Sequence, residues 1–116
     1  MAPGSWVQYA LLLLAALLLG WKIFTGLAAK RRIPALLAEG AVIIDVRSPS
    51  EFAAAHATGS RNIPLSEIDQ AAKNFNTDQW VIVCCASGTR SGMARRKLMA
   101  RGFAKVLNAG SWRNLP

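Results

Sequence analysis

The sequence of 116 residues has few of the side chains that bind metals or form disulfide frameworks. It contains two cysteines, the adjacent Cys84 and Cys85, and a single histidine, His56. Two neighbouring cysteines cannot cross-link distant parts of a chain, so a disulfide-stabilised fold is excluded. No Cys/His cluster has metal-ligand spacing, and we expect neither a metal nor another cofactor. The pair is more typical of a reactive thiol in a reducing compartment.

Acidic residues are also scarce, and their distribution divides the chain. Six acidic residues face fourteen basic ones, for a formal net charge of +8, and residues 1–32 contain no acidic residue. Four of the basic residues lie in that segment: Lys22, Lys30, Arg31 and Arg32. Basic clusters beside an apolar segment are typical of a membrane surface. No basic motif interleaved with aromatic residues is present, so we expect no nucleic-acid partner.

A long apolar segment at residues 6–29 predicts a transmembrane helix that contacts the lipid bilayer. Its 24 residues would span about 36 Å as a helix, enough for a hydrocarbon core of about 30 Å. Trp6 and Tyr9 at one end and Trp21 at the other are typical interfacial anchors. Lys22 can extend its ammonium group to the headgroups.

The charged residues that flank this segment predict its orientation. Lys30, Arg31 and Arg32 follow the apolar segment, and no charged residue precedes it. We therefore expect a single-pass protein of the inner membrane, with the C-terminal part on the cytoplasmic side. A cleavable signal peptide is the alternative, although it would carry positive charge before the apolar run. We therefore predict two parts of the chain: a membrane anchor with a basic flank at residues 1–32, and a second domain at residues 33–116.

The second domain alternates between helical and strand patterns. Helices are expected at 33–40, 48–55, 66–73 and 91–101, and strands at 41–46, 59–63, 80–84 and 105–108. This alternation predicts an α/β fold, a small parallel sheet with helices on both faces. Ligands of such sheets bind beyond the carboxyl ends of the strands.

One such strand end carries the residues of a candidate site. The apolar run at 80–84 leads into a thiol, a loop of small residues and a helix that begins near Ser91. Small residues allow successive N–H groups to surround an anion, and a helix N-terminus adds its unpaired N–H groups. A cysteine that faces these groups ionises more readily, and its thiolate is a nucleophile. The expected substrate-binding residues are Ala86, Ser87, Gly88, Thr89, Arg90 and Ser91.

The choice of cysteine determines the expected chemistry. From Cys85 the spacing to Arg90 is Cys-x4-Arg, a tight loop that suits a small sulfur-centred ligand. From Cys84 it is Cys-x5-Arg, the spacing of cysteine-dependent phosphatases and arsenate reductases, although no general acid is recognisable. We predict that Cys85 is the catalytic residue. Cys84 would then end the strand and pack away from the loop.

Five stretches together resemble the rhodanese-like sulfurtransferase family. They are C-A-S-G-T-R-S at 85–91, D-V-R-S-P-S-E-F at 45–52, H-A-T-G-S-R-N-I-P at 56–64, G-F at 102–103 and N-A-G-S-W at 108–112. The resemblance covers residues 35–113. It implies a cysteine persulfide, formed from thiosulfate or another sulfane-sulfur donor and passed to cyanide, a thiol or an acceptor protein. Ala86 stands where many members carry a second Arg, so strong affinity for doubly charged thiosulfate is not expected.

The remaining polar residues of these stretches are expected to support the fold. Asp45, Arg47 and Glu51 fit a helix cap and charged hydrogen bonds between loops. His56 is expected to make a structural hydrogen bond. A non-catalytic rhodanese-like binding module stays open as an alternative, and the sequence does not indicate an oligomeric state.

Overall fold

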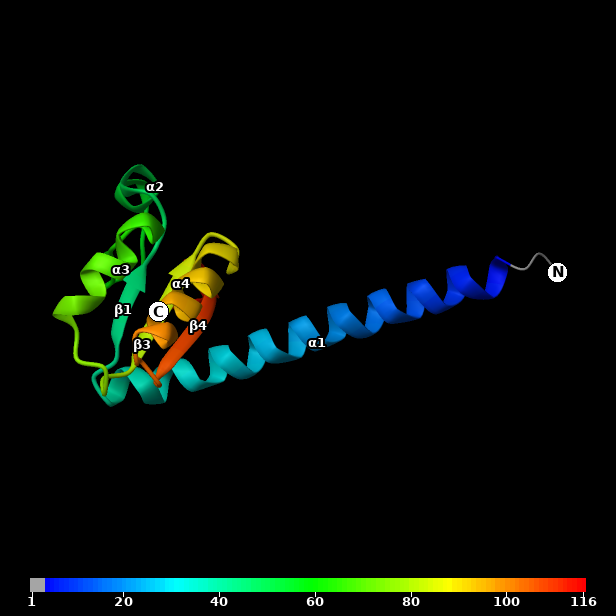
Figure 1. The fold of residues 1–116 in the computed structure, drawn as a ribbon, viewed down its shortest axis with the longest axis horizontal. Coiled ribbons are helices and arrows are strands. Elements are labelled where there is room, and N and C mark those ends of the chain that lie inside the picture. Colours follow the sequence, from blue (N-terminus) through cyan, green and yellow to red (C-terminus); the bar gives the residue numbers. More distant parts are fainter. Residues whose placement is uncertain (1–3) are drawn as a thin grey trace.

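A computed structural model of the protein describes residues 4–116 (Figure 1). A long N-terminal helix leads into a small α/β domain, from which most of the helix projects. The elements in order are α1 (Ser5–Ala38), β1 (Val42–Asp45), α2 (Pro49–Ala54), β2 (Arg61–Asn62), α3 (Ile68–Ala71), β3 (Val81–Cys85), α4 (Thr89–Ala100) and β4 (Val106–Ser111). Short 3-10 turns occupy Leu65–Glu67, Ala72–Asn74 and Trp112–Asn114.

The four strands form one parallel sheet in the order β2-β1-β3-β4. After β1 the chain goes first to β2 on one side and then to β3 on the other. The direction of winding therefore reverses between β1 and β3, and ligands of open α/β sheets bind at such a point. The carboxyl ends of β1 and β3 carry Asp45 and Cys85.

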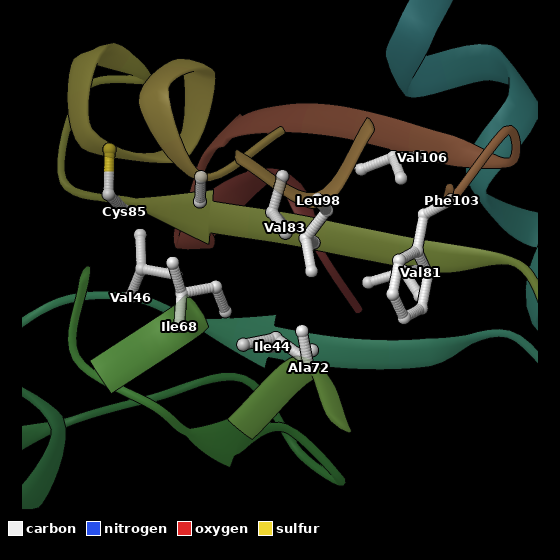
Figure 2. Packing of buried hydrophobic residues seen from close by; sticks show 11 residues of the cluster. Ile44, Val46, Ile68, Ala72, Val81, Val83, Cys85, Leu98, Phe103 and Val106 are labelled. Carbon is white, nitrogen blue, oxygen red and sulfur yellow. The ribbon is translucent and has the colours of Figure 1, made fainter. Parts of the chain in front are cut away.

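The central strand β3 supplies side chains to a separate core on each face of the sheet. Val81, Val83 and Cys85 face one core, where α3 and α4 contribute Ile68 and Leu98 (Figure 2). The intervening residues of β3 pack in the other core with the C-terminal end of α1. Helices therefore cover both faces of a parallel sheet, which confirms the expected fold class.

The expected separate helix at 33–40 is wrong, because α1 continues through this segment. Pro34 lies inside α1 rather than in the first turn of a new helix. A proline within a helix costs about 3 kcal/mol. Burial of a large aliphatic side chain contributes about 1.5–3 kcal/mol. Ile33 and Leu36 are both buried against the sheet, so their packing offsets the free-energy cost of keeping Pro34 inside the helix.

Two boundaries near the candidate site also differ from expectation. Strand β3 ends at Cys85, not Cys84, and α4 begins at Thr89, two residues before Ser91. Strand β4 is longer than expected, because a bulge opposite Val83 and Cys84 lets pairing continue to Ser111. Bulges often occur beside functional sites, where they redirect side chains.

Candidate functional site

The loop between β3 and α4 turns sharply at Gly88. This residue has φ of 101°, and a Cβ atom there would lie 3.2 Å from the Cα of Gly110 on β4. A side chain at 88 would therefore be strained by its own backbone and by its neighbour. The tight turn lets the loop fold back over the end of β3.

The thiol of Cys85 lies under this loop. The Gly88 N–H donates to Cys85 Sγ at 2.9 Å, and Ser91 Oγ lies 3.3 Å from the same sulfur. The residue is only 1% exposed. In Figure 2 its sulfur points toward the loop and not along the sheet. The structure thus brings Cys85, Gly88 and Ser91 together as the sequence predicts.

The surroundings of Cys85 favour its thiolate. Burial alone would raise the pKa of Cys85. Hydrogen bonds from the Ser91 side chain and from the backbone amides of Ser91, Ser87 and Gly88 outweigh this effect and lower the pKa below its ordinary value. A thiolate surrounded by amides at a helix N-terminus is an activated nucleophile.

Asn108 supports the site, and the sequence analysis did not identify it as a site residue. Ser91 Oγ donates to Asn108 Oδ1 at 2.7 Å, and Asn108 Nδ2 donates to the Gly88 carbonyl at 3.1 Å. The Gly110 N–H also donates to Asn108 Oδ1, at 2.9 Å. One amide side chain on β4 therefore holds both the loop and the start of α4. The sequence offers two signals: Asn108 follows the apolar pair Val106 and Leu107, and it begins the N-A-G-S-W stretch that resembles the family.

The hydroxyl of Ser91 has one proton and two neighbouring acceptors. Because that proton goes to Asn108, the Cys85 thiol can donate its own proton to Ser91 Oγ. Once the thiol ionises, the hydroxyl can turn and donate to the sulfur. Asn108 Oδ1 then keeps its hydrogen bond from Gly110. The site can therefore satisfy both forms of the cysteine.

The other predicted loop residues present mainly backbone groups. Ala86, Ser87 and Thr89 are exposed. Arg90 reaches away to α2, where its Nη1 and Nη2 contact the Glu51 carboxylate at 2.7 and 3.0 Å. This fork holds the pKa of Glu51 near 2, with added hydrogen bonds from Ser48. Arg90 thus ties the loop to α2 and brings a positive charge near the cysteine.

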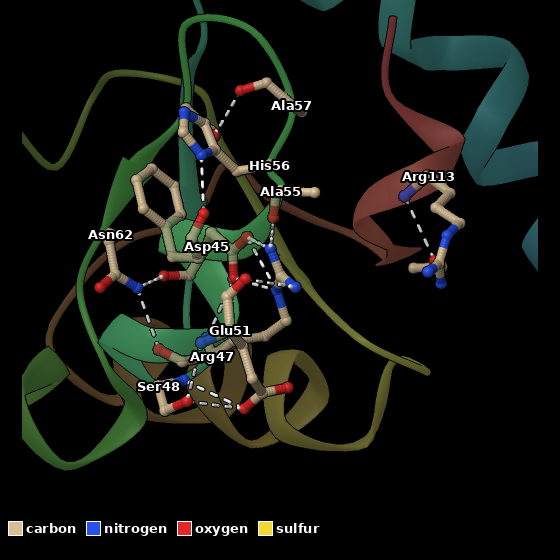
Figure 3. A network of polar contacts seen from close by, with 12 residues as sticks. Asp45, Arg47, Ser48, Glu51, Ala55, His56, Ala57, Asn62 and Arg113 are labelled. Carbon is tan, nitrogen blue, oxygen red and sulfur yellow. Dashed lines mark hydrogen bonds and ion pairs between the residues drawn. The ribbon is translucent and has the colours of Figure 1, made fainter.

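A second charged network lies beside this ion pair (Figure 3). Arg47 forms a buried pair with Asp45, with Nη2 2.7 Å from Oδ2, and it also donates to the Ala55 carbonyl. Glu51 and Ser48 form the predicted capping box at the start of α2. The expected scaffolding contacts of Asp45, Arg47 and Glu51 are therefore present.

His56 has the expected structural position. Its Nδ1 lies 2.8 Å from the Phe52 carbonyl, and its ring stacks on Phe52 with 3.7 Å between centroids. No contact links it to Cys85 in the described part of the chain. Within residues 4–116, no group of three His, Cys, Asp or Glu side chains has the arrangement of a metal site.

Cys84 lies on the opposite face of the sheet, and this contradicts the phosphatase alternative. Its side chain is fully buried among Ile82, Leu107 and their neighbours. Burial, with a smaller effect from the Asp45 charge, raises the pKa of Cys84 to about 12. An inaccessible and protonated thiol cannot serve as the nucleophile of a Cys-x5-Arg loop.

The structure is a parallel sheet with a cysteine under an amide-lined loop, and sequence comparison identifies the family to which it belongs. The sequence model of the rhodanese-like domain matches residues 31–114, nearly three quarters of the chain. The protein therefore belongs to the rhodanese-like sulfurtransferase family.

Individual relatives agree with this assignment. The chain is 41% identical over 68 residues to the uncharacterized protein YqhL of Bacillus subtilis, covering 59% of this chain and 54% of that protein. It is 36% identical over 72 residues to thiosulfate sulfurtransferase GlpE of Pseudomonas entomophila, covering 62% and 66%. The chain thus spans about half of YqhL and just under two thirds of GlpE.

A solved structure shares the fold. It is a rhodanese with anions from E. coli, which is 34% identical and superposes with a TM-score of 0.62. The match covers 66% of this chain and 94% of that one.

Proposed function

We propose that the protein is a membrane-anchored sulfurtransferase in which Cys85 carries the sulfur. The donor is thiosulfate or another sulfane-sulfur compound. The acceptor is a thiophilic group, such as cyanide, a low-molecular-weight thiol or a protein thiolate. Two successive displacements on one cysteine constitute covalent catalysis.

In the first displacement the Cys85 thiolate attacks the outer sulfur of thiosulfate. A bond forms between Sγ and that sulfur, and the S–S bond of thiosulfate breaks. Sulfite leaves with the bonding electron pair, and Cys85 becomes a persulfide anion. In the second displacement the acceptor attacks the terminal sulfur, and the Cys85 thiolate leaves with the electron pair. Cyanide thereby becomes thiocyanate, and neither step needs an external oxidant or reductant.

The observation that carries this proposal is the set of donors around Cys85 Sγ. The sulfur has the Gly88 amide at 2.9 Å and the Ser91 hydroxyl at 3.3 Å, and its pKa is lowered. The same donors, with the start of α4, can stabilise negative charge on the donor and on the persulfide. Ala86, Ser87, Thr89 and Arg90 would complete the substrate-binding loop through their amides and the Arg90 charge.

The membrane anchor is the second part of the proposal. Helix α1 contains an apolar window long enough to cross a membrane, with a mean hydropathy of 2.0, and that window is not buried in the protein. A signal sequence would meet the same criteria. We favour a retained anchor because Ile33 and Leu36 of the same helix pack in the domain core. The basic residues 30–32 favour a cytoplasmic domain, and the anchor and the domain would meet within α1.

Mass spectrometry of the thiosulfate-treated full chain in detergent tests the chemistry. The wild type and Cys84→Ser should gain the mass of one sulfur atom, and Cys85→Ser should gain none. Absence of an adduct in all three proteins would favour a non-catalytic binding module. Alkaline extraction of membranes tests the anchor separately, because an integral protein stays in the pellet.

A further inference from the structure

A groove separates the Cys85 loop from helix α1. One wall is the segment of α1 between Lys22 and Arg32, and the other is formed by the loop at Ser87–Thr89 and the first turns of α4. Part of β4 forms the floor, and the volume is about 1050 Å³. We call this space the α1–loop groove. It connects the rim of the candidate site with the helix that we propose to cross the membrane.

The charged side chains that line the groove are all basic. Lys22 and Arg32 come from α1, and Arg95 and Arg96 come from α4. Among residues 4–116, no Asp or Glu lines this space. Lys97 of α4 and Arg101, which follows α4, both form ion pairs with Asp69, and neither of these two cations lines the groove. Charge complementarity therefore indicates an anionic occupant.

Two of these arginines are held in place by the fold. Arg95 Nε donates to the Val106 carbonyl at 3.0 Å, and the Arg32 guanidinium lies 5.1 Å from the centre of the Trp80 ring. Neither interaction neutralises the charge. A basic side chain that the fold already holds in place loses less conformational entropy on binding an anion than a freely moving side chain does.

The position of the groove along α1 sets the level of the membrane surface. From Lys22 onward the helix faces the domain across the groove, so lipid chains cannot surround it there. The preceding residue, Trp21, is 68% exposed and is a typical interfacial side chain. The membrane-embedded segment would then end near Trp21 rather than at residue 29. Residues 6–21 span about 24 Å as a helix, and local bilayer thinning accommodates such a shortfall.

We propose that the α1–loop groove binds the headgroup phosphate of an anionic phospholipid. The Cys85 loop would then lie at headgroup level, beside the bilayer surface. Acceptor thiols held at the membrane would reach the site without crossing bulk solvent. This proposal rests on the membrane anchor proposed above, but it does not depend on the sulfur chemistry.

Native mass spectrometry of the full chain in detergent micelles tests the groove. The probes are dioleoyl phosphatidylglycerol and dioleoyl phosphatidylcholine, added separately. The wild type should retain phosphatidylglycerol in preference to phosphatidylcholine. Lys22→Gln combined with Arg96→Gln should weaken phosphatidylglycerol binding about thirtyfold. Each lost basic side chain at an anionic surface accounts for about a fivefold to sixfold loss of affinity.

The matched control is Lys30→Gln combined with Arg31→Gln. It removes the same total charge, two positive charges, but both come from α1 and neither residue lines the groove. We expect this variant to bind phosphatidylglycerol like the wild type. An equal loss in both variants, or no loss in the first, would overturn the proposal. Persulfide loading and alkaline extraction, measured on the same proteins, show separately whether the chemistry or the anchor has failed.

Discussion

The side chains of Cys84 and Cys85 lie on opposite faces of the sheet, although one peptide bond joins the two residues. Cys85 Sγ accepts the Gly88 N–H under the loop, and Cys84 packs in the core formed with the end of α1. The alternation of side chains along a strand produces this separation. It gives the two thiols opposite pKa shifts, lowered for Cys85 and raised to about 12 for Cys84.

Replacement of Ser91 by alanine should make the Cys85 thiol less reactive near neutral pH. The Ser91 hydroxyl lowers the pKa of Cys85, so its removal raises that pKa and reduces the thiolate fraction. A hydrogen bond to a charged group contributes about 1.5–3 kcal/mol. We therefore expect iodoacetamide alkylation to slow by about tenfold or more.

The measurement is the alkylation rate as a function of pH, in a Cys84→Ser background. Ser91→Ala should shift the profile toward higher pH, whereas Ser66→Ala, which removes an exposed hydroxyl elsewhere, should not. An unchanged profile for Ser91→Ala would mean that the backbone amides alone set the pKa.

Gly88→Ala should distort the loop. Its positive φ costs about 1–2 kcal/mol for a residue with a side chain, and the new Cβ would approach Gly110 Cα to 3.2 Å. Gly59→Ala is the matched control, because Gly59 also has a positive φ, 78°, but nothing lies within 4 Å of its Cβ position. Both variants should lower the thermal midpoint, and only Gly88→Ala should also slow alkylation of Cys85. Equal alkylation rates in the two variants would contradict the role assigned to the turn.

The Arg90–Glu51 pair should contribute stability that depends on pH. The folded state lowers the pKa of Glu51 from about 4.5 to about 2, chiefly through the Arg90 hydrogen bond. Because the pKa of Glu51 is lower in the folded state, its ionised carboxylate stabilises the fold above pH 4.5, and this contribution is lost as the pH falls toward 2. The difference in free energy of unfolding between wild type and Glu51→Gln should therefore shrink over that range.

Glu67→Gln provides the control for this pH dependence. Glu67 is exposed, and within residues 4–116 it forms no ion pair. Its replacement should change stability little between pH 2 and pH 4.5. A Glu51→Gln difference that stays constant with pH would argue against the assigned pair.

These residues also show what a sequence can predict for this fold. The strand, loop and helix around Cys85 and the capping box of Ser48 and Glu51 follow from local patterns, and all are present. The contacts of Asn108 with Ser91 and Gly88 could not be predicted. They join residues 17 and 20 positions apart, and they depend on the register and bulge of β4.

The same limit applies to Arg90 and to Pro34. The sequence places Arg90 at the loop but does not show that Glu51, 39 residues earlier, binds its guanidinium. Pro34 predicts a helix start by local rules. Packing of Ile33 and Leu36 against the sheet overrides that preference and makes α1 continuous. Tertiary contacts decided both outcomes.

Ala86→Arg should strengthen the use of thiosulfate. Ala86 is exposed at the loop, one residue after Cys85. A guanidinium near a doubly charged anion contributes about 1 kcal/mol at an exposed site. We expect KM for thiosulfate to fall about fivefold with kcat little changed, and Ala86→Gln should leave KM unchanged. An unaltered KM in Ala86→Arg would show that a cation at residue 86 does not assist the donor.

Transfer of labelled sulfur tests the central claim most directly. The full chain in detergent is treated with thiosulfate labelled at its outer sulfur, freed of excess donor and then exposed to cyanide. The wild type and Cys84→Ser should first hold one labelled sulfur per chain and then release it as labelled thiocyanate, whereas Cys85→Ser should hold none. Label that persists in Cys85→Ser and disappears in Cys84→Ser would contradict the account.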